Sequence, residues 1–330
     1  MTDYENELIS KLNEARPNNK SSSHKQYVRC LRLLSKKNKE DTFNNVDFAK
    51  DTDLVFNLTD DLSNSTRRNY LTACANILRL EEKSEGIDEI IKYYEDKVKE
   101  YNDEYIKQNN TGKISDKQKE VFDIGMSGLL DMMYNMEKKI SDPTTYLAYT
   151  IYSILLNHPL RNEVGTLEKI TLTDFNKLKV GAHPTAEFEG KNWLVIPSNV
   201  YKKPLTIVST NYKTNDKYGT KKVEIVNPLL RRKLLNYIRD TGNIKSGPLF
   251  MYKDKPLNEK TLTDILLYQS KIYTNEKVSV GTTMFAKITL SHDFNEINEL
   301  MKKKAVERGH SSGIQSLTYI KQSNPVGKQS

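Results

Sequence analysis

Cysteine and histidine are scarce in this sequence. Its two cysteines, Cys30 and Cys74, stand far apart and form no C-x-x-C pair, so they predict neither a disulfide framework nor a zinc site. The five histidines are too scattered for the usual spacing of metal ligands. A G-x-x-x-x-G-K-[ST] phosphate loop is also missing. We therefore expect an intracellular protein of a reducing compartment that uses no metal and no other cofactor.

Long apolar runs are missing as well. No stretch reaches the roughly 18 apolar residues of a transmembrane helix, so we expect no membrane association. The first residues, MTDYENELISKLNEARP, are acidic and polar, and we expect no secretory signal there. Charge is abundant instead, with 51 basic against 43 acidic residues and a net charge of +8. This excess favours a polyanionic partner such as nucleic acid, although many intracellular proteins are basic too.

The first part of the chain has the apolar spacing of helices. Helical patterns cover residues 4–16, 21–37, 46–60 and 63–83, and a long charged helix follows at about 87–108. The polar segment NNTGKIS, 109–115, predicts a linker. We therefore expect a helical domain at 1–110 and a second domain at 111–330. Several cations of the first domain could face a phosphate backbone, although an ordinary solvated helix face is the better local explanation: Lys20, Lys25, Arg29, Arg67 and Arg68.

The second part mixes helices with short strands. Helical patterns at 115–139 and 144–161 come first, and the second of these is apolar enough for a buried helix. Four β-branched segments follow, ITLTDF, NWLVIPS, LTIVSTNYKT and KKVEIV, and NDKYGT at 215–220 predicts the loop of a hairpin. From NPLLRRKLL onward the pattern is helical to the end. The fold class we expect is mainly α with a small antiparallel β-sheet.

Four stretches carry residues suited to phosphate chemistry. They are HPLRNEV with Arg161, NYKTNDKYG with Lys213, TTMFAKITL with Lys287, and GHSSGIQSLTYI with His310 and Tyr319. Each alone has an ordinary interpretation, since a surface arginine forms an ion pair and a hairpin lysine is solvated. Their order and spacing together are far more specific, because Lys287 stands 23 residues before His310 and Tyr319 nine residues after it.

This set resembles the tyrosine recombinases, or phage-type integrases. LRNE at 160–163, Lys213 with Thr214, MFAK at 284–287, GHSS at 309–312 and TYI at 318–320 match the family's boxes. The resemblance covers roughly 115–321, and helices of the first domain are similar to the family's core-binding domain. In style the chain is most similar to recombinases of large DNA viruses and mobile elements.

The resemblance implies both a fold and an activity. The fold is a core-binding domain followed by a catalytic domain of the DNA breaking-rejoining type, and four protomers would assemble on two double-stranded DNA sites. The activity is DNA integration or recombination by strand cleavage and rejoining, without metal or ATP. We expect this to take place wherever the target DNA resides, in the cytoplasm, the nucleus or a viral factory.

The chemistry of phosphodiester cleavage explains why these residue types belong together. Attack on phosphorus builds negative charge, which the Arg161 guanidinium can clamp at two oxygens while His310 donates a further hydrogen bond. Lys213 would protonate the departing 5′ oxygen. Tyr319 would be the nucleophile and form a 3′-phosphotyrosine ester that keeps the bond energy for rejoining.

The sequence departs from the family pattern in its first and third boxes. In the third, Met284 stands at the family's histidine and Lys287 at its arginine, and lysine lacks the planar fork of arginine. His292 is an alternative for this box, but it lies nearer to His310 than the family spacing; we prefer Lys287. In the first box, Glu163 follows Arg161 by two positions instead of three, and we expect Asp174 to share its supporting role.

Two other functions fit parts of the same pattern. A type IB topoisomerase uses similar Arg, Lys, His and Tyr chemistry and relaxes supercoils as a monomer. A DNA-binding relative with weakened or lost catalysis would keep the fold alone. The spacing from GHSS to the tyrosine and the small helical first domain favour the recombinase.

Overall fold

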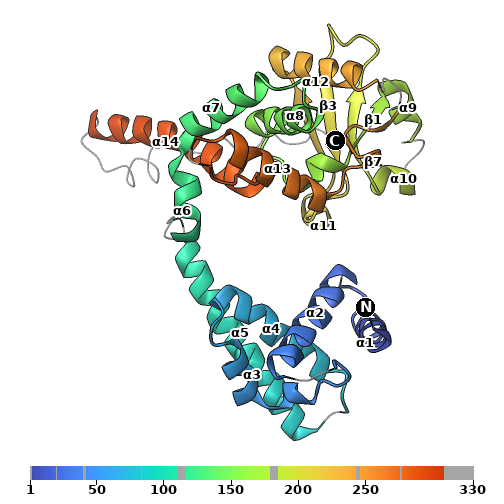
Figure 1. Cartoon of the computed structure of the whole chain (residues 1–330), viewed down its shortest axis with the longest axis vertical. Coiled ribbons are helices and arrows are strands. Elements are labelled where there is room, and N and C mark those ends of the chain that lie inside the picture. Colours follow the sequence, from blue (N-terminus) through green and yellow to red (C-terminus); the bar gives the residue numbers. More distant parts are fainter. Residues whose placement is uncertain are drawn as a thin grey trace, which may run out of the picture. The chain divides into compact units, whose positions relative to one another are not determined.

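The chain folds into two compact units. The computed structural model describes residues 2–19, 21–39, 42–82, 84–110, 114, 116–178, 185–242, 246–275 and 277–307. We name the two parts the N-terminal unit (Met1–Lys113) and the C-terminal unit (Ile114–Ser330) (Figure 1). Each has a hydrophobic core of its own. The division falls in the polar segment that the sequence marked as a linker, three residues beyond the expected boundary.

The described part of the N-terminal unit is built from helices. They are α1 (Asp3–Ala15), α2 (Ser21–Lys37), the 3-10 turn η1 (Asp47–Lys50), α3 (Thr52–Thr59), α4 (Asn64–Leu78) and α5 (Glu85–Asn110). Thr2 and Glu5 form a reciprocal capping box that starts α1. Leu31, Leu71 and Tyr94 lie fully buried between the helices, and the Tyr94 hydroxyl donates to the Ala49 carbonyl at 2.9 Å.

The C-terminal unit is mainly helical, with a small mixed sheet. Its helical elements are α6 (Asp116–Asp123), α7 (Gly125–Glu137), α8 (Pro143–Asn157), η2 (Asn162–Thr166), α9 (Leu172–Lys177), α10 (Ala186–Glu189), α11 (Asn215–Tyr218), α12 (Pro228–Asp240), α13 (Glu259–Tyr273) and α14 (Thr282–Glu307). Helix α8 begins with Asp142, whose carboxylate accepts from the Thr145 amide, and with Pro143 in the first turn. Nearly all of its middle turns are buried, as its apolar sequence predicted.

The sheet corrects the sequence expectation of a purely antiparallel arrangement. Its strands are β1 (Leu167–Thr171), β2 (Asn192–Ile196), β3 (Leu205–Ser209), β4 (Lys221–Ile225) and β5 (Gly247–Pro248), in the order β4-β3-β2-β1-β5. β1 and β2 are parallel, and the other pairs are antiparallel. The cause is the connection 172–191, which contains α9 and α10 and is long enough to return the chain to the starting edge.

Alternate strand residues enter two different cores. Leu194 and Ile207 belong to the main core, which includes α8 and α12. Trp193 and Val208 point to the opposite face, where Phe175 of α9 and Phe188 of α10 cover them. The strands are therefore buried on both faces, which explains their near-continuous apolar sequence.

Three local expectations also need correction. The segment ITLTDF is a strand only to Thr171, whose side chain accepts from the Asp174 amide and so caps α9. The hairpin of β3 and β4 is present, but its connection includes the helical turn α11. The chain after 228 is not helical throughout, because β5 joins the sheet and β6 (Met251–Tyr252) pairs with β7 (Lys255–Pro256).

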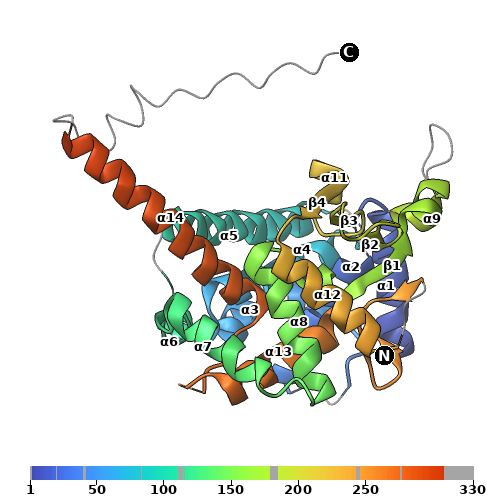
Figure 2. The ribbon, with the colours of Figure 1, turned by 90° about the horizontal axis from the view of Figure 1, so that it is seen from above.

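Tyr152 of α8 contacts α13 and the start of α14. Its side chain is fully buried, and its hydroxyl lies 3.0 Å from the Leu266 carbonyl of α13 and 2.5 Å from the Val280 carbonyl just before α14. Its ring also stacks on Phe285 of α14, with 5.1 Å between centroids. The first turns of α14 are thus fixed to α8, while its later turns lead away from the sheet (Figures 1 and 2).

We predict that Tyr152→Phe lowers the free energy of unfolding of the C-terminal unit by about 1–3 kcal/mol, because the buried O–H that serves the Val280 and Leu266 carbonyls is lost. The chain has a single tryptophan, Trp193, so its fluorescence during urea unfolding reports on this unit alone. Tyr201→Phe is the control, since Tyr201 is 88% exposed. Equal stability of the two variants would contradict the role given to the Tyr152 hydroxyl.

Candidate functional site

The structure describes three of the five residues that the sequence singled out. Arg161 lies directly before η2, Lys213 lies in the connection from β3 to β4, and Lys287 lies in the second turn of α14. Arg161 and Lys213 are exposed, and Lys287 is half-buried. His310 and Tyr319 lie outside the described residues, so the expectations for both stay predictions.

A sharp turn presents Arg161. Helix α8 ends at Asn157, and Arg161 has an extended backbone, with φ −95° and ψ −162°, as the cap of η2. No hydrogen bond or ion pair joins its guanidinium to any residue within the described ranges. An exposed guanidinium without a protein partner keeps all five N–H donors free for an anion.

The η2 turn is tied to the start of α14 by Asn162, the residue after Arg161. The Thr282 hydroxyl donates to Asn162 Oδ1 at 2.6 Å, and Asn162 Nδ2 donates to Thr263 Oγ1 of α13 at 3.1 Å. Thr282 is the first residue of α14, and Lys287 follows five residues later. The backbone that carries Arg161 and the helix that carries Lys287 are therefore fixed to each other.

The same turn is tied to the Lys213 segment at the edge of the sheet. Leu167 of β1 pairs with Asn192 of β2, Asn192 with Ser209 of β3, and Ser209 with Lys221 of β4. The turn η2 ends just before Leu167, and the Lys213 connection starts just after Ser209. Both therefore lie at the same edge of the sheet, where β1 begins and β3 ends. Asn192 Nδ2 donates to Thr166 Oγ1 of η2 at 3.0 Å and to the Asn211 carbonyl at 2.9 Å.

Glu163 and Tyr212 lie buried beneath this edge. Tyr212 is 6% exposed, and its hydroxyl donates to the Gly219 carbonyl at 2.6 Å, which closes the loop that contains Lys213. Burial, together with the Glu163 carboxylate, raises the pKa of Tyr212.

Lys287 and His292 differ in their surroundings. Lys287 Nζ donates to Gln118 Oε1 of α6 at 2.8 Å, so its ammonium lies against α6. His292 is exposed, with its Nδ1 3.7 Å from Asp293 Oδ1 of the same helix. Met284 packs against the main core and leaves its position in the third box without a hydrogen-bonding group. Along α14, Lys287 lies closer than His292 to Thr282, the residue that is bonded to Asn162.

The expected support of Arg161 by Asp174 is wrong. The Asp174 carboxylate accepts from Lys177 Nζ at 2.7 Å and from Thr171 Oγ1 at 2.8 Å, both within its own helical turn. These bonds lower the pKa of Asp174, with Lys177 contributing most. Asp174 therefore serves the start of α9, on the edge of the sheet opposite to η2.

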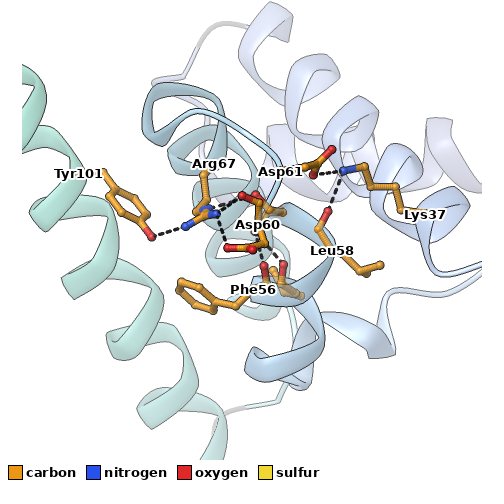
Figure 3. Close-up of polar contacts among 9 residues, drawn as sticks. Lys37, Phe56, Leu58, Asp60, Asp61, Arg67 and Tyr101 are labelled. Carbon is orange, nitrogen blue, oxygen red and sulfur yellow. Dashed lines mark hydrogen bonds and ion pairs between the residues drawn. The ribbon is translucent and has the colours of Figure 1, made fainter.

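Two of the N-terminal cations that could have faced DNA are used inside the fold. Figure 3 shows the Arg67 guanidinium, which donates to the Thr59 and Asp60 carbonyls at 3.1 and 2.8 Å and to the Tyr101 hydroxyl at 3.2 Å. Arg67 thus ties the end of α3 to α5. Arg68 donates to Asn102 Oδ1 at 2.5 Å. Lys25 and Arg29 of α2 are exposed, and Lys20 lies outside the described residues.

Comparisons with known proteins add no relative. The chain has no significant match to a protein-family model, to a curated protein or to a solved structure. Within the described ranges, no cluster of three or more His, Cys, Asp or Glu side chains could hold a metal ion. No helix there is long and apolar enough to cross a membrane.

Sequence reasoning missed the two asparagines that connect the site. Asn162 stands inside the LRNE box and could have been noticed as the neighbour of Arg161. Asn192 opens a strand and gives no such signal, because its partner Thr166 is 26 residues away in the sequence. The candidate cations are visible in the sequence. The residues that position the backbone next to them, Asn162 and Asn192, are visible only in the hydrogen bonds of the structure.

We predict that Asn162→Ala lowers the free energy of unfolding of the C-terminal unit by about 1–3 kcal/mol, because the buried Thr282 hydroxyl loses its acceptor. In a double-mutant cycle with Thr282→Val, measured by Trp193 fluorescence in urea, the coupling energy is expected at about 0.5–3 kcal/mol. Asn199→Ala is the control, because the Asn199 side chain accepts from the amides of Tyr201 and Lys202 in its own exposed turn and links no other element within the described residues. Additive effects would show that the Asn162–Thr282 bond carries no coupling.

We also predict that the C-terminal unit loses stability as the pH falls from about 7 to about 5. Burial lowers the pKa of His158, three residues before Arg161, and its buried Nε2 has no partner within the described part of the chain. The unfolded chain takes up a proton near the ordinary pKa of about 6.5, whereas folded His158 does so only at lower pH. Protonation therefore favours unfolding. The free energy of unfolding in urea is measured by Trp193 fluorescence across this pH range. It should depend less on pH in His158→Gln than in the unchanged protein, and His292→Gln is the control that should behave like the unchanged protein. An unchanged pH dependence in His158→Gln would contradict the role given to His158.

Proposed function

We propose that the C-terminal unit cleaves and rejoins double-stranded DNA through a covalent 3′-phosphotyrosine at Tyr319. What supports the proposal is that the η2 turn after Arg161 is hydrogen-bonded to the start of α14 through Asn162 and to the root of the Lys213 loop through Asn192. Three segments far apart in the sequence are thereby joined in one network. The joined segments carry Arg161, Lys213 and Lys287, three of the five residues whose order and spacing resemble a tyrosine recombinase.

Each side chain has a distinct task in the proposed reaction. Arg161 binds two non-bridging phosphate oxygens, since a guanidinium can donate to both at once. Lys287 adds a positive charge to the same phosphate after exchanging its hydrogen bond with Gln118 for one with the anion. His310 donates a hydrogen bond to the phosphate, and Lys213 supplies the proton for the 5′ oxygen. Fixed charges at the position of the developing negative charge are a large source of rate acceleration.

The charge of the Lys213 loop fits a DNA partner. Residues 211–222 contain four lysines and one aspartate, and Lys213, Lys217, Lys221 and Lys222 are all exposed. Tyr218 in the same loop is 62% exposed. Cations that neutralise phosphates release counterions, which makes binding salt-dependent. The proposal includes assembly of four copies on two DNA sites, because strand exchange needs a second cleaved duplex.

The predicted nucleophile is tested with a duplex that carries a nick next to the cleaved bond, so that the short product diffuses away and the covalent complex accumulates. We expect the unchanged protein to form a protein–DNA band that survives denaturation, and Tyr319→Phe to form none, because the phenolic oxygen is missing. The retained DNA affinity of Tyr319→Phe, measured by gel shift, shows that the variant is folded. Tyr268→Phe is the matched control, since Tyr268 is an exposed tyrosine of α13.

The same assay separates the alternatives. A covalent band that persists in Tyr319→Phe would refute Tyr319 as the nucleophile. Supercoil relaxation by a monomer, with no joined products from two duplexes, would assign the protein to type IB topoisomerase chemistry. Tight, salt-dependent DNA binding without any band in the unchanged protein would leave a non-catalytic DNA-binding protein.

A further inference from the structure

The side chain of Asn192 makes every hydrogen bond that an amide can make. It is 2% exposed at the first position of β2. Its Nδ2 donates to Thr166 Oγ1 and to the Asn211 carbonyl, and its Oδ1 accepts from the Thr210 and Asn211 amides at 3.2 and 3.0 Å. Two donors and two acceptor sites are the full capacity of the group.

These bonds continue the sheet beyond its last strand pair. The ladder between β2 and β3 ends where Asn192 faces Ser209. The Asn192 side chain then takes over and fixes the backbone of Thr210 and Asn211, the two residues after the strand. Tyr212 follows with a buried ring, and Lys213 is the exposed side chain that comes next. Asn192 therefore sets the point from which Lys213 leaves the fold.

Asn192 also sets that point relative to Arg161. Its bond to Thr166 reaches the last residue of η2, and Thr166 itself donates to the Glu163 carbonyl at 2.9 Å within the same turn. A lysine side chain has a flexible four-carbon stem, so its ammonium is only as well placed as its backbone. Loss of the Asn192 bridge removes the direct hydrogen-bonded link between the Lys213 loop and the Arg161 turn.

We propose that Asn192 is a positioning residue that holds the proton donor Lys213 at a fixed distance from the phosphate clamp Arg161. This inference rests on the proposed function of the C-terminal unit. It assigns Asn192 to one step of the reaction, protonation of the leaving group, and to no other step.

The chemistry of that step provides a selective test. The Tyr319 oxygen forms a bond to phosphorus and gives up its proton to water, while the bond from phosphorus to the 5′ oxygen breaks. The electron pair of the broken bond goes to the 5′ oxygen, which takes a proton from Lys213. If sulfur replaces that oxygen, the leaving group is a thiolate, whose acid has a pKa of about 8.5, and it departs without a proton. A defect in proton delivery is therefore repaired by sulfur, whereas a defect in phosphate binding or folding is not.

The experiment compares cleavage rates of the nicked duplex with oxygen and with sulfur at the 5′ bridging position. For Asn192→Ala we expect a loss of about 10-fold or more on the oxygen substrate, which is part of the roughly 100- to 10,000-fold that general acid catalysis contributes. On the sulfur substrate we expect a rate within about 3-fold of the unchanged protein. Thr166→Val, which keeps the shape of the side chain but removes the acceptor for Asn192, should show the same pattern more weakly. Arg161→Ala should be slow on both substrates.

Asn227→Ala is the matched structural control. Asn227 also bridges two elements, since it donates to Asn157 Oδ1 at 2.7 Å and accepts from the Leu229 amide, but it lies at the start of α12. Its loss should affect both substrates equally. A second readout, amide hydrogen exchange, should show faster exchange of Thr210 and Asn211 in Asn192→Ala than in Asn227→Ala.

The outcomes separate this inference from the proposed function. If the unchanged protein cleaves and Asn192→Ala loses equal activity on both substrates, or loses none, the positioning role is overturned and the proposed function stands. If the unchanged protein forms no covalent complex on either substrate, the proposed function is overturned and the inference falls with it. A sulfur-specific recovery of both Asn192→Ala and Thr166→Val supports the inference.

Discussion

The hydrogen bonds of two asparagine side chains are the interactions on which the candidate site depends. The turn of five residues after Arg161 packs Val164 into the main core, and two side chains link it to other segments: Asn162 to the start of α14, and Asn192 to the residues that follow β3. Both bonds join residues of different elements, and both are partly buried. A buried hydrogen bond adds little net free energy to folding, but a buried polar group left without its partner is costly. Such bonds therefore favour one arrangement of the segments that they join over all others.

The two cores of the C-terminal unit give this network a rigid base. Helix α8 passes through the main core and ends four residues before Arg161, and Tyr152 fastens it to α13 and to the start of α14. On the other face, the aromatic cluster around Trp193 fixes β2 and thereby the backbone of Asn192. Exposed cations on such supports lose only side-chain entropy on binding an anion, because their backbones are already ordered. The same base explains why a loop lysine can serve as a proton donor in the proposed reaction.

The sequence predicted the elements better than their connections. Residues 21–37 form α2 as predicted, because serines at the start and an apolar stripe are local signals. The parallel pairing of β1 and β2 could not be predicted, since strand direction depends on the crossover 172–191 and no residue within a strand encodes it. The bond from Thr282 to Asn162 spans 120 positions and likewise leaves no local pattern. For Arg67 the sequence suggested a cation free to face DNA. In the structure its guanidinium is bonded to the end of α3 and to Tyr101, and no local pattern in the sequence indicates these bonds.

The central claim is that Arg161, Lys213 and Lys287 serve one phosphate. The most direct measurement is an experimental structure of the full chain bound to a nicked DNA duplex. The account predicts that the three side chains meet at a single phosphate, with the Arg161 and Lys287 nitrogens at hydrogen-bond distances of about 2.7–3.2 Å from its non-bridging oxygens and the Lys213 ammonium beside its 5′ oxygen. Three cations bound to different phosphates, or turned away from the DNA altogether, would contradict it.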